Sequence, residues 1–241
     1  MNHSCAAFFD KDTKECKQTI EDHITSGIKF LEEMYIKRRY DGYITRLAHN
    51  LKINIPRAEV QRALYASYIF HDIGKLFKGY QEMKTNFSGH EIISSYWVYV
   101  HGEKMSLGST LYPVIYAILL HHHDIRRSSV RKLTDIELCE ECLKKLIKVY
   151  MDKTGVNIRD FIHKFEEEVS QQLLKVMGEI KRKMQKNTSI VIRLAYTFLQ
   201  VIHSVDNYSS LYRSGKQTLL SKEVAKVYFS VWRLRENFSV E

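Results

Sequence analysis

Imidazole and carboxylate side chains, which bind metal ions, stand where apolar stretches of this sequence end. His71 and Asp72 are adjacent and close the apolar run before Gly74. A histidine supplies a nitrogen ligand, and an aspartate supplies two oxygens that bind one metal ion or bridge two. Successive side chains of a helix point about 100° apart, so the two can share a site only where the helix ends, as Gly74 suggests. Alone, such a pair more often caps a helix than binds a metal.

Further histidines and a late aspartate make metal binding the better interpretation. His121, His122 and His123 close the apolar run 115–120, and His90 follows a predicted helix start. Three consecutive rings would be a poor core design, since each brings a polar group that needs a partner. Metal ligation is the simplest shared partner. Asp206 adds a carboxylate at the end of an apolar helical stripe, where an ordinary surface residue is an equally good interpretation.

The elements that must position these residues are predicted to be helices. Apolar residues recur at helical spacing, whereas alternation with a period of two is almost absent, so the fold class is all-α. Pro56 suits the first turn of a helix that runs to about Phe70. The run 189–212 predicts a late helix, and the apolar residues before His121 predict one that begins near Thr110.

Two capping signals and one charged stretch predict further helices. Ser88 with Glu91, and Thr134 with Glu137, have the S/T-x-x-E spacing, so helices are expected to begin just after Ser88 and Thr134. The charged stretch 157–185 predicts one more helix.

Length and composition favour one domain. The chain has 241 residues, 44% of them hydrophobic, and only two prolines and ten glycines, so no Pro/Gly/Ser-rich linker divides it. We expect a single globular domain over residues 1–241, with a motif-bearing core at about 20–212 and a C-terminal helical extension at 213–241. Thirty-seven Lys and Arg against twenty-eight Asp and Glu give a formal net charge of +9, which favours polyanionic partners without identifying them.

The number of cysteines and the length of the apolar runs indicate in which cellular compartment the protein is expected. Four cysteines in a chain of this length do not predict a disulfide framework, which fits a reducing compartment. No run approaches the ~18 apolar residues of a membrane span, so a cytoplasmic protein without a membrane partner is expected. Cys139-x-x-Cys142 could belong to a zinc module, but no second pair in the sequence completes four ligands.

Taken together, the motifs resemble the HD metal-dependent phosphohydrolase superfamily, and specifically the CRISPR-associated HD nucleases of type I interference. The family core, His-Asp-apolar-Gly-Lys and then an aromatic-Gln pair, is matched by residues 71–75 and by Tyr80 and Gln81, with tyrosine replacing the usual phenylalanine. The later motifs are matched by His90 with Ser94, His121 with His122, and Asp206 with Ser210.

Two positions of the motif series stay open. His23 suits the first histidine, expected on the opening helix, and His49 is its rival. His123 stands where the family commonly has glycine, so it could replace His121 or His122 as a ligand.

The resemblance implies a site for two divalent metal ions. One ion would be held by His23, His71, Asp72 and Asp206, and the second by Asp72, His90, His121 and His122. Asp72 would bridge the ions and so take part in catalysis. Mixed nitrogen and oxygen ligands favour Mn, Ni, Co or Fe, with Mg as the alternative. Lys75 would stabilise charge on the scissile phosphate, unless it is an ordinary solvated lysine.

The implied activity is a metal-dependent nuclease that hydrolyses phosphodiester bonds, with single-stranded DNA as the expected substrate and RNA as the alternative. Arg126, Arg127, Arg131 and Lys132 follow the histidine run and predict a basic strip that binds backbone phosphates. The sequence has no G-x-x-x-x-G-K-[ST] phosphate loop, so a helicase subunit would act in trans, together with an RNA-guided CRISPR surveillance complex. The rival functions are an HD phosphohydrolase of nucleotides or cyclic nucleotides and a non-enzymatic nucleic-acid-binding subunit.

Overall fold

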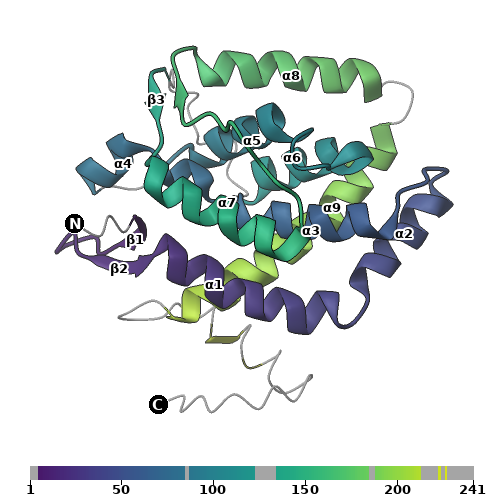
Figure 1. The fold of residues 1–241 in the computed structure, drawn as a ribbon, viewed down its shortest axis with the longest axis horizontal. Helices are drawn as coiled ribbons and strands as arrows, with labels where there is room; N and C mark the ends of the chain where they lie inside the picture. The colour runs from purple at the N-terminus through teal and green to yellow at the C-terminus, as the bar shows by residue number, and fades with distance from the viewer. Residues whose placement is uncertain are drawn as a thin grey trace.

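Figure 1 shows the computed structural model, which describes residues 5–84, 87–122, 134–184 and 188–212, together with residues 222, 223 and 226. Most of this part of the chain is helical, and its strands form only two short antiparallel pairs, β1 with β2 and β3 with β4. The apolar faces of the helices share one large core. The predicted all-α fold is confirmed.

The first hairpin leads directly into the opening helix. β1 (Ala6–Phe9) pairs with β2 (Cys16–Thr19), and α1 (Ile20–Leu31) follows without a break. The hydroxyl of Thr19 accepts a hydrogen bond from the Asp22 N–H at 3.1 Å, which caps the helix. α1 buries one apolar stripe, and His23 lies within that stripe. A π-helical turn (Glu32–Ile36) and α2 (Tyr40–Asn50) come next.

The central helix carries the His-Asp pair at its end. α3 (Arg57–Ile69) begins after Pro56 and buries every residue from 63 to 69, because α1, α6, α7 and α9 pack around it. Burial on all sides explains why the second half of this helix, residues 63–69, has no charged side chain, whereas its first half carries Arg57, Glu59 and Arg62. A 3₁₀ turn (Ile73–Leu76) and the short α4 (Lys78–Met83) follow. The predicted helix from Pro56 to about Phe70 is confirmed.

Three later helices bring further residues to the end of α3. α5 (His90–His101) packs against α6 (Leu111–Leu120) and against α8 (Val169–Met184), which runs along the upper edge in Figure 1. α9 (Thr188–Ser209) packs on α6, α1 and α3, and ends in a 3₁₀ turn (Ser210–Tyr212). The predicted helices near Thr110 and over 189–212 are therefore present.

Of the two helix starts predicted from capping boxes, the one after Ser88 is present and the one after Thr134 is not. α5 does begin just after Ser88, but its N-cap residue is Gly89 at φ 89°, and no side chain caps it. The helix predicted after Thr134 is wrong: the chain there is extended, as β3 (Ile136–Glu137), and α7 (Glu140–Thr154) begins later. Ile136 pairs with Phe165, so tertiary pairing overrides the local capping signal.

The single helix predicted over 157–185 is also wrong. The first part is irregular and contains β4 (Lys164–Phe165), and only the second part forms α8. Side chains of α5 hold the irregular part: the Trp97 indole donates to the Ile162 carbonyl at 2.9 Å, and the Ile162 N–H donates to His101 Nε2 at 3.1 Å. These bonds replace the backbone pairing that a helix would supply.

The N-terminus is tied to α7. Cys5 and Cys142 form one disulfide across 137 positions of sequence, a pairing that the cysteine count did not predict. The hairpin makes this pairing possible because it lays Cys5 beside the start of α7.

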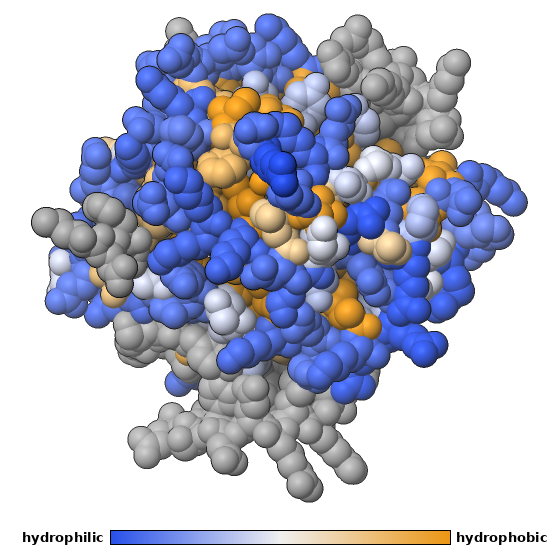
Figure 2. Space-filling view, in the orientation of Figure 1, coloured by the Kyte–Doolittle hydropathy of each residue, from blue (hydrophilic) through white to orange (hydrophobic). Residues whose placement is uncertain are grey.

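Polar residues cover most of the face seen in Figure 2, with apolar residues in patches between them. Among the described residues, no helix is both long and apolar enough to cross a membrane. The extension predicted at 213–241 lies, apart from three residues, outside the described residues.

Candidate metal centre

Asp72 lies at the centre of the site, just past the end of α3, with its side chain 1% exposed. Its two carboxylate oxygens face different partners. Oδ2 lies 3.4 Å from His71 Nε2 and 3.5 Å from His23 Nε2. Oδ1 lies 3.0 Å from His90 Nε2 and 3.8 Å from His121 Nε2. One carboxylate therefore stands between two sets of nitrogens.

The first set combines α1, α3 and α9. Asp206 Oδ1 lies 3.1 Å from His23 Nε2 and 3.7 Å from His71 Nε2. One ligand atom from each of His23, His71, Asp72 and Asp206 lies within 4.8 Å of the others, a spacing that could hold a metal ion. We call these four residues the first group.

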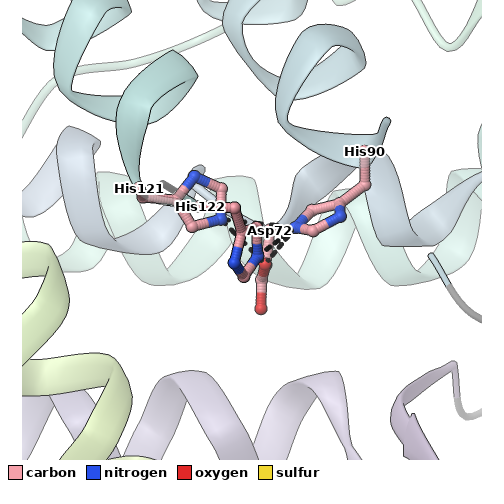
Figure 3. Close-up of side chains that lie close together, drawn as sticks. All are labelled: Asp72, His90, His121 and His122. Atoms are coloured by element: carbon pink, nitrogen blue, oxygen red, sulfur yellow. Dashed lines mark hydrogen bonds and ion pairs between the residues drawn. The ribbon is translucent and has the colours of Figure 1, made fainter. Parts of the chain in front are cut away.

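The second set combines α3, α5 and α6. In Figure 3 the ring of His90, from the start of α5, and those of His121 and His122, from the end of α6, converge on Asp72. His90 Nε2 lies 3.3 Å from His121 Nε2 and 3.2 Å from His122 Nε2. Nitrogen lone pairs at this separation repel unless a proton or cation lies between them. Asp72 and these three histidines are the second group, which also has the spacing of a metal site.

Three of the imidazoles, whose Nε2 atoms face the site, are oriented by hydrogen bonds at Nδ1. A backbone carbonyl can only accept, so a ring nitrogen beside one must carry the proton. Three rings make this bond to the carbonyl three residues earlier: His71 to Tyr68 at 2.5 Å, His90 to Phe87 at 2.6 Å and His121 to Ile118 at 2.5 Å. Each Nδ1 is thereby protonated, and each Nε2 faces the site, as in histidines that bind metals.

The charges in the site are strongly coupled. Burial alone would raise the pKa of Asp72, but the His71 ring and the Lys75 ammonium hold it well below its ordinary value. Burial and then the neighbouring rings lower the pKa of His121 to about 4. Both carboxylates of the site, Asp72 and Asp206, are therefore ionised at neutral pH, and the ring of His121 is neutral.

The protein alone leaves part of this polarity unsatisfied. In the described part of the chain, His71 Nε2, both Asp72 oxygens and Asp206 Oδ1 are buried without a hydrogen-bond partner of good geometry. Buried polar atoms without partners destabilise a fold by several kcal/mol in the worst cases. Imidazole nitrogens and carboxylate oxygens suit divalent transition metals, so the residues present fit one ion in each group.

Lys75 is not a solvated surface residue. It is 4% exposed, and its Nζ lies 2.7 Å from Asp72 Oδ2 and 4.4 Å from the centre of the Phe8 ring. The Phe8 ring also meets the ring of His23, edge to face, at 5.5 Å. Phe8 belongs to a four-residue strand that sequence periodicity did not reveal, so its place in the site wall was missed.

Tyr68 and Ser209 support the first group and were also missed. The Tyr68 hydroxyl donates to the His23 carbonyl at 2.9 Å, and the Ser209 hydroxyl lies 3.1 Å from His23 Nδ1. The motif match had paired Asp206 with Ser210, but Ser210 bonds to the Asn207 carbonyl instead. The spacing could have suggested Tyr68, which lies one helical turn before His71.

A close backbone approach explains two motif positions of the second group. A Cβ on Gly74 would lie 2.1 Å from the His90 carbonyl oxygen, so only glycine fits there. The Gly74 N–H donates to Ser94 Oγ at 2.9 Å, and that hydroxyl donates to the His90 carbonyl at 2.8 Å. Gly74 and Ser94 thus fix the position of His90.

Two other predicted positions lie apart from these groups, and the rest fall outside the described residues. His49 is exposed on α2 and belongs to neither group. Tyr80 is buried, and its hydroxyl donates to the Ser88 carbonyl, as a core residue would. His123 and the predicted basic strip, Arg126, Arg127, Arg131 and Lys132, lie outside the described residues.

A helical bundle with a His-Asp pair at its centre fits the resemblance to HD domains, and comparisons with known proteins agree with it. No family model matches the chain. The CRISPR-associated endonuclease Cas3-HD of Methanocaldococcus jannaschii is 28% identical over 140 residues, which cover 55% of this chain and 57% of that protein. The protein of the same name from Pyrococcus furiosus is 23% identical over 139 residues, 55% of this chain and 58% of that protein. The chain thus spans little more than half the length of these relatives.

A solved structure extends the match to most of the chain. The CRISPR-associated Cas3 HD domain protein from Methanocaldococcus jannaschii superposes with a TM-score of 0.56 at 21% identity, covering 83% of this chain and 98% of that one. The HD-domain fold and the resemblance to CRISPR-associated HD nucleases are confirmed.

Proposed function

We propose that this chain is a divalent-metal-dependent nuclease that hydrolyses phosphodiester bonds of nucleic acid, with single-stranded DNA as substrate, in CRISPR interference. The observation that carries the proposal is the position of Asp72, whose two oxygens face two separate groups of imidazoles. A carboxylate shared in this way suits two ions rather than one. The relatives named as CRISPR-associated endonucleases support the nuclease reaction.

The two groups would hold the ions, and nitrogen-rich ligation favours Mn, Ni, Co or Fe over Mg. When bound, two divalent ions would supply Lewis-acid chemistry, that is, activation of a water molecule and stabilisation of charge on a phosphodiester. The chain's own contribution is orientation. The Nδ1 bonds of His71, His90 and His121 fix their rings before substrate arrives. Lys75 adds a buried positive charge 2.7 Å from Asp72, which favours negative charge developing beside it.

The burial of the ligands indicates how substrate reaches the site. His23, His71 and Asp72 are fully buried, whereas the Asp206 side chain is 27% exposed and His122 is exposed. The nucleic acid would therefore approach past His122 and Asp206. Arg126, Arg127, Arg131 and Lys132 follow His122 in sequence and would bind its backbone phosphates, with weak sequence preference and strong dependence on salt.

We also propose the domain organisation, cellular location and partner subunits of the nuclease. Residues 1–241 would form one HD-type domain in the cytoplasm. Strand separation would come from a helicase subunit in trans, recruited with an RNA-guided surveillance complex, as the resemblance to CRISPR-associated HD nucleases implies.

A cleavage assay tests the proposal against its main rival. Labelled single-stranded DNA, duplex DNA, RNA, mononucleotides and cyclic nucleotides are incubated with the protein and with Mn²⁺, Co²⁺, Ni²⁺ or Mg²⁺. We expect cleavage of single-stranded DNA with a transition metal, its loss in Asp72→Ala, and its retention in Asp152→Ala, which removes an exposed carboxylate of α7. Rapid hydrolysis of mononucleotides with intact DNA would favour the nucleotide phosphohydrolase instead.

A further inference from the structure

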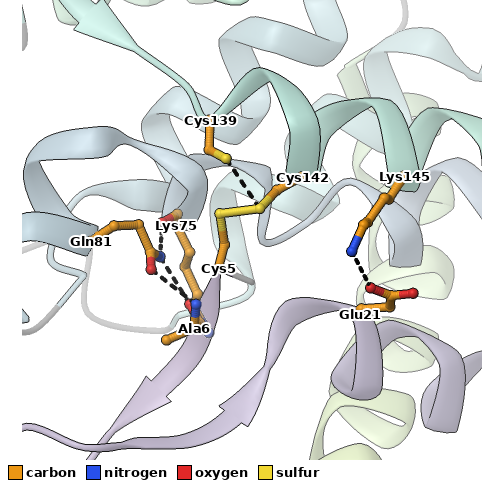
Figure 4. The surroundings of a disulfide bond; sticks show 8 residues. All are labelled: Cys5, Ala6, Glu21, Lys75, Gln81, Cys139, Cys142 and Lys145. Carbon is orange, nitrogen blue, oxygen red and sulfur yellow. Dashed lines mark hydrogen bonds and ion pairs between the residues drawn. A yellow bond between two sulfur atoms is a disulfide. The ribbon is translucent and has the colours of Figure 1, made fainter. Parts of the chain in front are cut away.

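Three of the four cysteines meet at one place in the fold, although they come from distant parts of the chain. Cys5 begins the N-terminal hairpin, and Cys139 and Cys142 flank the start of α7 (Figure 4). The Cys139 and Cys142 sulfurs lie 3.1 Å apart, and all three sulfurs lie within 4.8 Å of one another. A disulfide needs two sulfurs, so the disulfide between Cys5 and Cys142 does not account for the third.

From this convergence we propose that the reduced cysteines Cys5, Cys139 and Cys142 form a second, separate metal site that binds one thiophilic divalent ion of the zinc type. Zinc–thiolate bonds are about 2.3 Å long, which places sulfurs about 3.8 Å apart in a tetrahedral site. Thiolates select soft metals, unlike the imidazole and carboxylate groups around Asp72. The disulfide is the oxidised, metal-free state of the same cluster.

The backbone holds Cys139 toward the other two sulfurs. The Cys139 N–H donates to the Leu76 carbonyl at 2.8 Å, and Leu138 pairs with Phe77. Cys139 is the N-cap residue of α7, yet its side chain makes no capping bond. Its thiol instead faces the Cys142 sulfur, to which it donates at 3.1 Å.

Two lysines near the cluster are each paired with a glutamate: Lys78 with Glu137 and Lys145 with Glu21, the latter at 2.7 Å. The described residues supply no fourth histidine, cysteine or carboxylate to this cluster, so a water molecule would complete the coordination.

The ion would fasten a strand that forms part of the candidate metal centre. The Gln81 amide bonds both backbone groups of Ala6, at 2.9 and 3.0 Å, and also donates to the Lys75 carbonyl at 2.7 Å. Two residues along the strand, Phe8 covers the Lys75 ammonium. A cross-link between Cys5 and α7, whether by metal or by disulfide, therefore keeps β1 against Lys75.

Cobalt spectroscopy of the full chain tests this site apart from the Asp72 centre. A phosphine reduces the disulfide: it takes oxygen from water to become a phosphine oxide, and the two sulfurs take up the protons. Co²⁺ is then added without air. Thiolate-bound cobalt absorbs strongly in the near ultraviolet, whereas cobalt bound only by imidazole and carboxylate does not. We expect this band at one equivalent of cobalt, and its disappearance when one equivalent of Zn²⁺ is added.

Matched serine variants give the control. Cys139→Ser should lose the band while keeping the Cys5–Cys142 pair, and Cys16→Ser, which removes an exposed cysteine outside the cluster, should keep it. A reduced wild-type protein without the band would overturn the proposal, as would an equal band in Cys139→Ser. The wild-type spectrum decides alone if Cys139→Ser does not fold, and neither result depends on nuclease activity.

Discussion

Replacing Asp72 with asparagine separates its role in the fold from its role in metal binding. In the metal-free protein, Lys75 is buried with its ammonium 2.7 Å from the Asp72 carboxylate. The attraction at that distance is about 6 kcal/mol for an effective dielectric constant of about 20. Removing one partner of a buried pair costs about 3–5 kcal/mol, because the other charge stays buried without compensation. Asp72→Asn should therefore lower the free energy of unfolding by about that amount.

The double variant Asp72→Asn/Lys75→Met removes both charges and should regain most of the lost stability, since apolar replacements of buried ion pairs are often neutral. Urea unfolding in a chelator measures both effects. Adding Mn²⁺ at about 100 times its dissociation constant should stabilise the wild type by about 2.7 kcal/mol per bound ion, and neither variant comparably. The reasoning fails if the single and double variants are equally unstable, or if Mn²⁺ stabilises them as it does the wild type.

Two further substitutions test the packing around the site. Gly74→Ala should destabilise the protein by about 1–3 kcal/mol, because the new Cβ would lie 2.1 Å from the His90 carbonyl oxygen. Gly178→Ala, with open space around the new Cβ in α8, should stabilise the protein by about 0.5–1 kcal/mol. Equal changes in the free energy of unfolding, measured in urea, would contradict this contrast. Burial lowers the pKa of His101 to about 4, below its ordinary value of 6.5. The unfolded chain binds the proton first, so the unfolding free energy should fall by about 3 kcal/mol as pH drops from 6.5 to 4. His101→Gln should remove most of this slope, and an unchanged slope would show that His101 is not its source.

Helices with a strong apolar pattern could be predicted from sequence, and the remaining segments could not. The helix over 189–212 contains its own periodic signal, and the helix after Pro56 is marked by its ends, with Pro56 at the start and Gly74 just past the last turn. The extended segment at Ile136 and the irregular one around Ile162 were taken for helix, since their partners Phe165 and Trp97 are distant in sequence. Local propensity carries no information about such partners.

The same distinction holds within the site. His71, Asp72, His90, His121 and Asp206 stand at predicted helix ends, and the structure brings their side chains together. Phe8 and Ser209 could not be found in this way, because their roles arise from where a hairpin and the last turn of α9 pack. Cys5 shows the limit most clearly: only the folded chain brings its sulfur to Cys139 and Cys142.

The central claim is that Asp72 joins two metal ions, and electron paramagnetic resonance of the Mn²⁺-loaded protein tests it most directly. Two Mn²⁺ ions that share a carboxylate give a spin-coupled signal, which a single ion cannot give. We predict this signal at two equivalents of Mn²⁺, and its replacement by an uncoupled signal in His90→Ala, which removes a nitrogen of the second group only. A wild-type protein that binds one uncoupled Mn²⁺ per chain would contradict the account.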